Sequence, residues 1–394
     1  MRRTPAYIVL LTVFIDLVGF GIIIPLLPFY AQHFGATPTV IGLLTASYSL
    51  MQFLFVPFWG RLSDRIGRRP IILMSVFGSF ISYLVFGFAG SIPILFLSRM
   101  LAGFMGANIS TANAYIADST TFEERAKYMG LIGAAFGVGF MLGPFIGGVM
   151  SKISYGAPGF LASGLSLVNV VLAYFLLPES LKENSRKTKR VSFFNFSVIR
   201  ESFRNPAIAG LVMVFFFYTI AFSNLYVAFP LFTGDVFKYG AEANGYLFAY
   251  IGLIGILIQG GATGRLVKKY GERKLIIAGV AMLLVGLVFV PGTRTLGSLL
   301  LLTTVLAIGS ALSSPSLTSL ISKHATEGEH GTVLGVSSSF TSLARVIGPF
   351  WGGFILGTAG IAWPFYTGGI MLMAALVIAL RVPVHPRESA ATKA

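Results

Sequence analysis

Apolar stretches separated by short polar segments repeat along the chain from about residue 6 to about residue 381. A helix needs about 20 apolar residues to cross the roughly 30 Å of hydrocarbon in a bilayer. Backbone groups in lipid must be hydrogen-bonded within the protein, and barrels use shorter alternating segments, so each stretch predicts a transmembrane helix. The predicted spans lie near residues 6–30, 40–60, 71–89, 93–115, 128–150 and 159–177, and then near residues 206–231, 243–262, 275–291, 297–320, 331–356 and 363–381.

Two motifs occur twice at almost the same separation. Residues 60–69 read GRLSDRIGRR, and residues 264–273, which lie 204 positions later, read GRLVKKYGER. LGPFIGG at residues 142–148 returns as IGPFWGG at residues 347–353, 205 positions later. Two unrelated motifs repeating at one spacing indicate that the chain is a duplicated half.

The duplication predicts the fold class and the domains. We expect an all-α membrane protein whose twelve transmembrane helices form two pseudo-symmetric six-helix bundles. The N-terminal bundle is expected at residues 1–180, a charged cytoplasmic linker at residues 181–205, and the C-terminal bundle with a short cytoplasmic tail at residues 206–394.

Composition and charge support a membrane location. Apolar residues make up 55% of the chain, charged residues only 11%, and the mean hydropathy is +0.82. With the N-terminus inside, three of the 29 Lys and Arg residues fall in outer loops (Lys152, Lys238 and Arg294) and two within spans, which leaves 24 on the inner side. The positive-inside rule therefore predicts both termini in the cytoplasm and a multi-pass protein of the cell inner (plasma) membrane. The net charge of +15 reflects this topology and lipid contact, not a nucleic-acid partner.

The residue content argues against an enzyme. The chain has no cysteine, so it has no disulfide, thiolate metal site or cysteine nucleophile. The spans hold no metal cluster, no nucleophile with a base and no carboxylate pair, and the P-loop pattern GxxxxGK[ST] is absent. We therefore expect no cofactor. The apolar N-terminal stretch is longer than a signal-peptide core and is expected to be a retained first span.

Four segments resemble the signature motifs of a known family. They are DLVGFGIIIPLLP from Asp16, the GRLSDRIGRRP loop, LSRMLAG at residues 97–103 and GFMLGPFIGG at residues 139–148. Together they resemble the major facilitator superfamily and, more narrowly, its twelve-span drug/proton antiporters close to the tetracycline efflux branch. The likeness covers about residue 7 to about residue 381. It implies a proton-coupled secondary transporter, an antiporter, that exports a small lipophilic or amphipathic compound such as a drug by alternating access.

The chain departs from the tetracycline efflux pattern. That branch carries a histidine in the eighth span and acids in the third and ninth spans, where this chain has Gly255, Ser82 and, approximately, Met282. Its four histidines lie in loops or the tail, at His33, His324, His330 and His385. Tetracycline itself is therefore not the expected substrate.

The first copy of the loop motif is a predicted conformational element. Its glycines permit a tight turn, and Asp64 is expected to face the positive end of a neighbouring helix and latch the bundles on the inside. The family resemblance implies the same role for Asp64 and Arg68. Lys268 stands at the place of Asp64 in the second copy, so the latch is expected to be asymmetric; the alternative is a loop that only sets orientation. The loop residues concerned are Gly60, Asp64, Arg65, Gly67 and Arg68.

The glycine-proline motif predicts a seam that slides or hinges. Gly139, Gly143 and Gly147 recur every four residues, which lets another helix approach closely, and Pro144 removes a backbone hydrogen bond. Gly348, Pro349 and Gly352 form the mirror copy in the eleventh span. The alternative is static packing.

Asp16 is the acid expected deep in the hydrocarbon. About ten residues into the first span at about 1.5 Å each, it lies near the midplane, where an aspartate costs on the order of 3 kcal/mol. We expect it to carry or gate protons; a purely structural pair or contact with a cationic substrate are the alternatives. Arg99, about 9 Å deep in the fourth span, is expected to reach toward it, and the family resemblance links this arginine to proton movement.

Polar and aromatic residues of the spans predict a substrate pocket. Its candidate members are Tyr48, Gln52, Asn113, Tyr218, Asn224, Tyr226, Tyr250 and Arg345. Asn113 shares a face of the fourth span with Arg99. Arg345 stabilises an anionic group or anchors to a helix end, and the aromatics alternatively face lipid.

The expected partners are therefore a small-molecule substrate, protons and the lipid bilayer, with the monomer as functional unit. The first alternative is a facilitator or symporter for a sugar, lipid or metabolite. The second is a non-transporting membrane receptor or scaffold.

Overall fold

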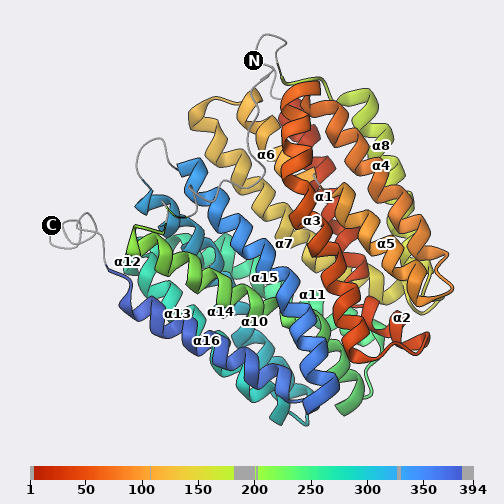
Figure 1. Ribbon diagram of the computed structural model, residues 1–394, viewed down its shortest axis with the longest axis vertical. Helices are drawn as coiled ribbons and strands as arrows, with labels where there is room; N and C mark the ends of the chain where they lie inside the picture. The colour runs from red at the N-terminus through yellow and green to blue at the C-terminus, as the bar shows by residue number, and fades with distance from the viewer. Residues whose placement is uncertain (1–3, 107, 182–199, 201–202, 326–329, 384–394) are drawn as a thin grey trace.

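The computed structural model describes residues 4–106, 108–181, 200, 203–325 and 330–383 (Figure 1). Within these ranges all regular structure is helical. The first half contains α1 (Thr4–Ile23), α2 (Leu27–His33), α3 (Pro38–Ile66), α4 (Arg68–Gly87), α5 (Ile92–Met105), α6 (Asn108–Ser119), α7 (Phe122–Met150) and α8 (Ala157–Leu176). The second half contains α10 (Pro206–Val236), α11 (Ala241–Leu257), the π-helical turn η2 (Ile258–Thr263), α12 (Gly264–Tyr270), α13 (Glu272–Phe289), the 3₁₀ turn η3 (Val290–Gly292), α14 (Leu296–His324), α15 (His330–Ala359) and α16 (Trp363–Arg381).

Each predicted span coincides with a helix or a broken helix. The fourth span is divided into α5 and α6, and the eighth runs through α11, η2 and α12. Eleven helical segments of the described chain are long and apolar enough to cross a membrane. The eleventh predicted span, α15, is not among them; it contains Arg345 and a run of serine and threonine residues, which lower its hydropathy. Most of the predicted linker, residues 181–205, lies outside the described residues.

Local sequence signals begin several of these helices. Thr37, Thr121, Asn205 and Thr295 each precede a helix, and their side chains accept hydrogen bonds from backbone N–H groups of its first turn. These contacts satisfy donors that have no partner within the helix. They set where spans begin at both faces of the molecule.

The helices form two bundles that repeat one packing scheme. In Figure 1 the red to yellow helices of the first half lie beside the green to blue helices of the second half. In the first bundle α1 packs on α7, and α4 packs on α5 and α8; in the second, α10 packs on α15, and α13 packs on α14 and α16. The prediction of an all-α membrane fold with two pseudo-symmetric six-helix bundles is confirmed.

The bundles meet along two related seams, α3 with α15 and α7 with α11. We call the end where α1 begins and α16 ends the terminal end, and the opposite end, where α2 lies, the α2 end (Figure 1). At the α2 end, a Cβ added to Gly42 would lie 2.6 Å from the carbonyl oxygen of Pro349, and one added to Gly245 would lie 2.5 Å from that of Pro144. Backbones therefore touch across both seams there.

The same four helices separate toward the terminal end. A Cβ added to any of a set of glycines nearer that end would meet no atom within 4 Å; these are Gly60 on α3, Gly130 and Gly133 on α7, Gly255, Gly260 and Gly261 on α11 and η2, and Gly331 and Gly335 on α15. Backbone contact across the seams therefore lies toward the α2 end and the middle of the helices, whereas the glycines nearer the terminal end have open space beside them.

Candidate functional site

Asp16 lies on α1 and contacts α4. The hydroxyl of Ser79 donates a hydrogen bond of 2.9 Å to Oδ1 of Asp16. One turn further along α1, a Cβ added to Gly19 would lie 3.0 Å from the ring of Tyr83. Neither Ser79 nor Tyr83 was predicted from the sequence. The signal that could have found them is the recurrence of serines and Tyr83 at helical spacing along α4.

Arg99 on α5 also lies close to Tyr83. Its side chain is 3% exposed, and its guanidinium carbon lies 5.1 Å from the ring centre of Phe86 and 5.9 Å from that of Tyr83. It donates a hydrogen bond of 3.2 Å to Ser98, whereas its buried Nε has no acceptor. Such cation–π contacts hold a buried cation without neutralising it.

Tyr83 connects these groups electrostatically. It interacts with the charges of both Asp16 and Arg99. The structure therefore brings the two predicted proton-coupling residues to one place through α4, while α1 contacts the fourth span itself through α6. We call Asp16, Ser79, Tyr83 and Arg99 the Asp16 cluster.

The break in the fourth span lies beside this cluster. Gln52 on α3 donates to the carbonyl of Gly106 at 3.2 Å and to the hydroxyl of Tyr48 at 3.3 Å. It thereby satisfies a carbonyl that the interrupted helix leaves without a helical partner. Asn113, beyond the break on α6, is half-buried.

The predicted aromatic residues fall into separate groups. The Tyr48 ring lies 5.0 Å from Phe20 of α1. On α10, Phe222 stacks on Tyr218 at 6.0 Å and meets Tyr226 edge-on at 6.2 Å.

Polar contacts hold three of the candidates in the second bundle. Tyr218 shares a hydrogen bond of 2.8 Å with Ser310, and Tyr250 shares one of 2.6 Å with Thr304. Asn224 is 1% exposed and donates to the carbonyl of Pro364 at 2.8 Å, so it ties α10 to α16.

Arg345 lies on α15 and is exposed. Its charge interacts with Tyr48 from the first bundle and with Tyr218 and Tyr226 from the second. No ion pair or hydrogen bond joins it to any residue that the structure describes. It is therefore a cation between the bundles that has tyrosines, but no anion, as neighbours among the described side chains.

The loop motif is held by three acids of its own bundle. Arg68 contacts Asp64 at 2.6 Å and Asp118 of α6 at 3.0 Å. Glu179, which follows α8, accepts hydrogen bonds of 2.9 and 3.2 Å from the backbone N–H groups of Arg68 and Arg69. An anion at a helix start is favoured by the helix dipole.

The geometry of the turn between α3 and α4 explains why residue 67 is a glycine. Gly67 has φ +112°, and a Cβ there would collide with Glu179. Arg65 is exposed at the end of α3. In this conformation Asp64 pairs with Arg68, not with the start of a helix of the other bundle. Asp118 and Glu179 escaped sequence analysis because each lies far along the chain from the loop.

The second loop copy contains the same pair with its charges exchanged. Oε1 of Glu272, the first residue of α13, lies 2.5 Å from Nζ of Lys323 on α14, and Ser319 donates to it at 3.0 Å. Glu272 is 204 positions after Arg68, and Lys323 is 205 positions after Asp118. The repeat preserves an ion pair but inverts its polarity, which motif comparison alone did not reveal.

The glycines of the glycine-proline motif pack within their own bundle. A Cβ at Gly143 would lie 2.6 Å from Cα of Gly21 on α1, and Gly139 and Gly147 face Leu17 and Ile22 in the same way. In the second bundle, Gly348 and Gly352 face Ile220 and Asn224 of α10. Gly148 and Gly353 are exceptions, because they, like the carbonyls of Pro144 and Pro349, touch the opposite bundle.

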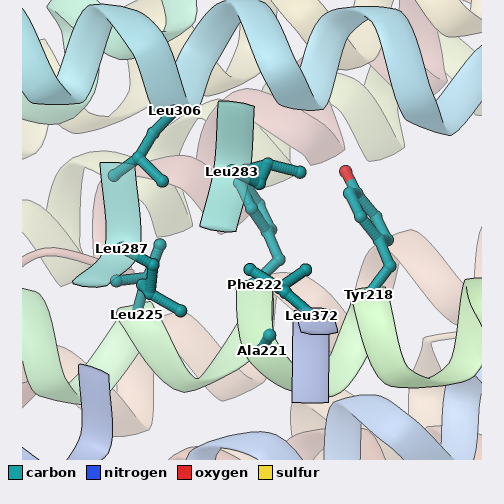
Figure 2. Close-up of a pocket in the computed structure, with 8 residues that line it drawn as sticks. All are labelled: Tyr218, Ala221, Phe222, Leu225, Leu283, Leu287, Leu306 and Leu372. Carbon is teal, nitrogen blue, oxygen red and sulfur yellow. The ribbon is translucent and has the colours of Figure 1, made fainter. Parts of the chain in front are cut away.

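The second bundle also contains a small internal gap between α10, α13, α14 and α16. Figure 2 shows its lining, which is apolar apart from the hydroxyl of Tyr218; the residues are Tyr218, Ala221, Phe222, Leu225, Leu283, Leu287, Leu306 and Leu372. It has no room for a water molecule. It is a packing defect of the bundle and no candidate for substrate binding. Among the described residues, no three His, Asp or Glu side chains gather to hold a metal ion.

Comparisons with known proteins agree with this architecture. The family model of the Major Facilitator Superfamily matches residues 9–268 and 260–394. The tetracycline resistance protein, class C, of Escherichia coli is 35% identical over 353 residues, covering 89% of each chain. Multidrug resistance protein 2 of Bacillus subtilis (strain 168) is 31% identical over 382 residues, covering 95% of this chain and 94% of that one.

Solved structures share the fold. A bacterial homologue of the human lysosomal transporter Spinster, in an inward-facing and occupied conformation, superposes with a TM-score of 0.79. The two sequences are 15% identical, and the match covers 98% of this chain and 100% of the other. At that identity the likeness concerns the fold alone.

Proposed function

Because this chain belongs to the Major Facilitator Superfamily, we propose that it is a proton-coupled antiporter that exports small lipophilic or amphipathic compounds from the cytoplasm by alternating access. It is a multi-pass membrane transporter of that superfamily and not an enzyme. The observation that carries the finer proposal is the Asp16 cluster, in which α4 contacts the acid through Ser79 and the buried cation Arg99 through Tyr83, inside the membrane-spanning helices.

Asp16 suits proton coupling because its environment depends on helix positions. It lies 12 residues after the start of α1, about 18 Å along the helix and away from both of its ends. Its carboxylate is stabilised by the hydroxyl of Ser79 on another helix, and Arg99 retains a donor without an acceptor. A movement that changes these contacts changes the relative free energy of the charged and neutral acid, and so binds or releases a proton.

The seams supply the second part of the mechanism. Backbone contacts close the space at the α2 end, while the glycines nearer the terminal end face open space. The positive-inside distribution supports a cytoplasmic terminal end. In that orientation the structure is open to the cytoplasm, and an exported compound enters from the side on which it is collected.

The loop motif is the proposed switch for the opposite state. Closing the terminal end requires the end of α3 to approach α15. We expect Asp64 then to exchange Arg68 for the positive start of a helix in the second bundle. The proposed moving bodies are residues 1–180 and 206–394 of one chain, linked by residues 181–205, so that the monomer is the functional unit.

The proposed substrates are those of a multidrug exporter. Relatives of this chain are named for resistance to tetracycline and to multiple drugs. Of the positions where the tetracycline efflux branch carries charged side chains, Ser82 is fully buried and donates to the carbonyl of Gly78, and Gly255 has no side chain. A site without those charges favours apolar contact over tetracycline-specific recognition.

Everted membrane vesicles with an acidified interior test the proposal. Addition of ethidium, rhodamine B or tetracycline is expected to make the interior less acidic for at least one compound, because an antiporter moves protons out as it moves substrate in. Further acidification would indicate a symporter, and substrate flux without a pH change a facilitator. Vesicles with neither flux nor pH change would support a receptor or scaffold.

Orientation is tested in the naturally cysteine-free chain. Arg65 and Gly90 are exposed at opposite ends of the first bundle. Arg65→Cys is expected to resist an impermeant thiol reagent in intact cells, whereas Gly90→Cys reacts. Permeabilised cells, in which both react, are the control; the reverse pattern in intact cells contradicts the topology.

A further inference from the structure

We propose that the transported compound is an organic anion or zwitterion with an apolar body, and that Arg345 binds its anionic group in the space between the bundles. This proposal rests on the proposed function, because it assumes that this space holds the substrate. It adds the chemical class that the site recognises and assigns the residue that recognises it.

Arg345 is too deep in the membrane to be an interfacial anchor. It lies 15 residues after the start of α15 and 14 before its end, which is roughly 21–22 Å from either end at 1.5 Å per residue. An arginine side chain reaches only about 7 Å, so it cannot bring its charge to the water layer at either face by snorkelling. An anchor to a helix end would also need an acceptor, and none exists among the described residues.

The helix face on which Arg345 lies is the one that meets the other elements of the transport path. Gly348 and Gly352, three and seven positions on, pack against α10, and Pro349, four positions on, touches Gly42 of α3. Arg345 lies one turn toward the terminal end from these contacts. It is exposed where the closed seam gives way to the open space.

The neighbours of Arg345 form a site that lacks an anion. Tyr48 of α3, and Tyr218 and Tyr226 of α10, all interact with its charge. Tyr48, Tyr226 and Phe222 are partly exposed and offer apolar surface, and the first two offer phenolic hydroxyls. Tyr218 is buried, and its hydroxyl is bonded to Ser310. Tyr48 also interacts with the charge of Asp16, so it lies near both Arg345 and the acid of the Asp16 cluster.

Two other buried arginines, Arg68 at a helix start and Arg99 within a span, have partners. Arg68 pairs with Asp64 and Asp118, and Arg99 lies over two aromatic rings and donates to Ser98. An unpaired cation in a membrane-spanning helix is costly, which makes it a functional candidate with an anionic ligand as its missing partner. A guanidinium binds carboxylate or sulfonate through two parallel hydrogen bonds, and the tyrosines accommodate the apolar body of such a compound.

The test measures binding to purified protein in lipid nanodiscs and does not require transport. Rhodamine B, naphthalene-1-acetic acid and ibuprofen are each compared with their ethyl ester, which removes the negative charge and keeps the apolar body. Kd is measured by fluorescence for rhodamine B, and thermal stabilisation is measured for every compound. At least one acid is expected to bind about tenfold more tightly than its ester, the size of effect that one charge-assisted contact supplies.

Variants locate the contact. Arg345→Gln is expected to weaken binding of the acid about tenfold and to change binding of the ester less than twofold, while Arg345→Lys retains most of the preference. Arg265→Gln, at an exposed position on α12, is the matched control and is expected to change neither.

Two results overturn the proposal: no acid binds better than its ester in the unmodified protein, or Arg345→Gln weakens acid and ester equally. The second would show a structural role for the arginine. The outcome is separable from the proposed function. Acid preference without proton exchange in vesicles would refute only proton coupling, and proton exchange without acid preference would refute only the anion site.

Discussion

The Asp16 cluster and its counterpart in the second bundle occupy the same place in the fold with opposite chemistry. The glycine-proline motif aligns the two, because Gly143 faces the carbonyl of Val18 and Gly348 faces that of Ile220, an offset of 202 positions between α1 and α10. The offset between α4 and α13, and between α5 and α14, is 204. The resulting equivalents of Asp16, Ser79, Tyr83 and Arg99 are Tyr218, Leu283, Leu287 and Thr303.

Three of these counterparts are apolar or aromatic and line the dry gap of Figure 2. The second bundle has therefore filled the position of the charged cluster with leucines, while keeping the packing scheme. One scaffold therefore holds a charged cluster in the first bundle and an apolar one in the second. We infer that proton handling is confined to the first bundle and that the second contributes substrate contacts, including Arg345.

A second contrast lies at the terminal end. Arg68 pairs with Asp118 in the first bundle, whereas Glu272 pairs with Lys323 in the second. An acid at the first position of a helix is favoured by the helix dipole, so Glu272 itself stabilises the start of α13. Arg68, at the start of α4, is disfavoured by the dipole of that helix. The carboxylate of Glu179 provides the negative charge at this helix start instead.

The largest effect is expected for Asp16→Asn. Accumulation driven by a pH gradient in proteoliposomes should fall more than tenfold, to background, because the amide cannot exchange a proton. Substrate binding should stay within about twofold. Tyr218→Phe, at the equivalent position of the second bundle, should reduce accumulation less than threefold. Equal losses in the two variants would contradict the inference that proton handling is confined to the first bundle. Undiminished pH-driven flux in Asp16→Asn would favour a facilitator.

The exchanged ion pair predicts a charge-swap rescue. Arg68→Glu places a third acid beside Asp64 and Asp118, and we expect it to destabilise the protein by about 2 kcal/mol, measured as a lower temperature of thermal unfolding. Adding Asp118→Lys recreates the order found in the second bundle and should recover more than half of the loss. No recovery in the double variant would mean that the bundles do not tolerate interchange of this pair.

The loop copies should differ in transport. Asp64→Asn is expected to lower initial flux about fivefold, because it removes the only acid of the two loops at this position. Lys268→Asn should lower flux less than twofold. Both variants are compared at equal expression and at saturating substrate; a similar loss in both would show that the asymmetry has no mechanical role.

The smallest effect is expected at the seams of the α2 end. Lys152, in the turn after α7, forms an ion pair of 2.7 Å with Glu242 of α11, whereas the equivalent positions on the other seam are Gly357 and Thr39. Glu242→Gln should change the open population at the α2 end less than about threefold, since exposed pairs contribute little. Thr39→Val is the control. Spin labels at Ser154 and Lys238, exposed on the two bundles, report the separation.

The pH dependence of this contact follows from Lys152. Its hydrogen bond to Glu242 and the charge of that carboxylate raise the pKa of Lys152 above its usual 10.5. A raised pKa means that the contribution is complete below pH 10.5 and is lost only as pH rises through the higher value. The difference in label separation between the unmodified protein and Glu242→Gln should therefore be the same at pH 6 and at pH 9; a difference that changes within that range would contradict the role of Lys152.

Much of the fold was predictable because hydrophobic length and repeat spacing are properties of the linear sequence. The predicted spans and the duplication follow from them, as does the depth of Asp16 and Arg99. The rotation of each helix about its own axis does not follow from these properties. Ser79 and Tyr83 belong to the cluster only because α4 turns them toward α1.

Contacts between distant segments were also beyond prediction. Glu179 lies more than 100 residues along the chain from the start of α4, whose N–H groups it accepts hydrogen bonds from. The ion pair of Glu272 with Lys323 could be recognised only once the structure placed the two residues side by side. For Asn224 the sequence suggested a contact that the structure uses differently. It was expected to line the substrate pocket, and its side chain joins α10 to α16. In each case the missing information is three-dimensional proximity, which residue type and spacing do not encode.

The paired contacts of Pro144 with Gly245 and of Pro349 with Gly42 define two pivot points without intervening side chains. A line through them is an axis about which the bundles can roll as levers. The arm of α3 from Gly42 to Ile66 is 24 residues, about 36 Å long at 1.5 Å per residue. A rotation of about 10° therefore displaces its far end by roughly 6 Å, which is comparable to the thickness of a planar drug with its contact layers.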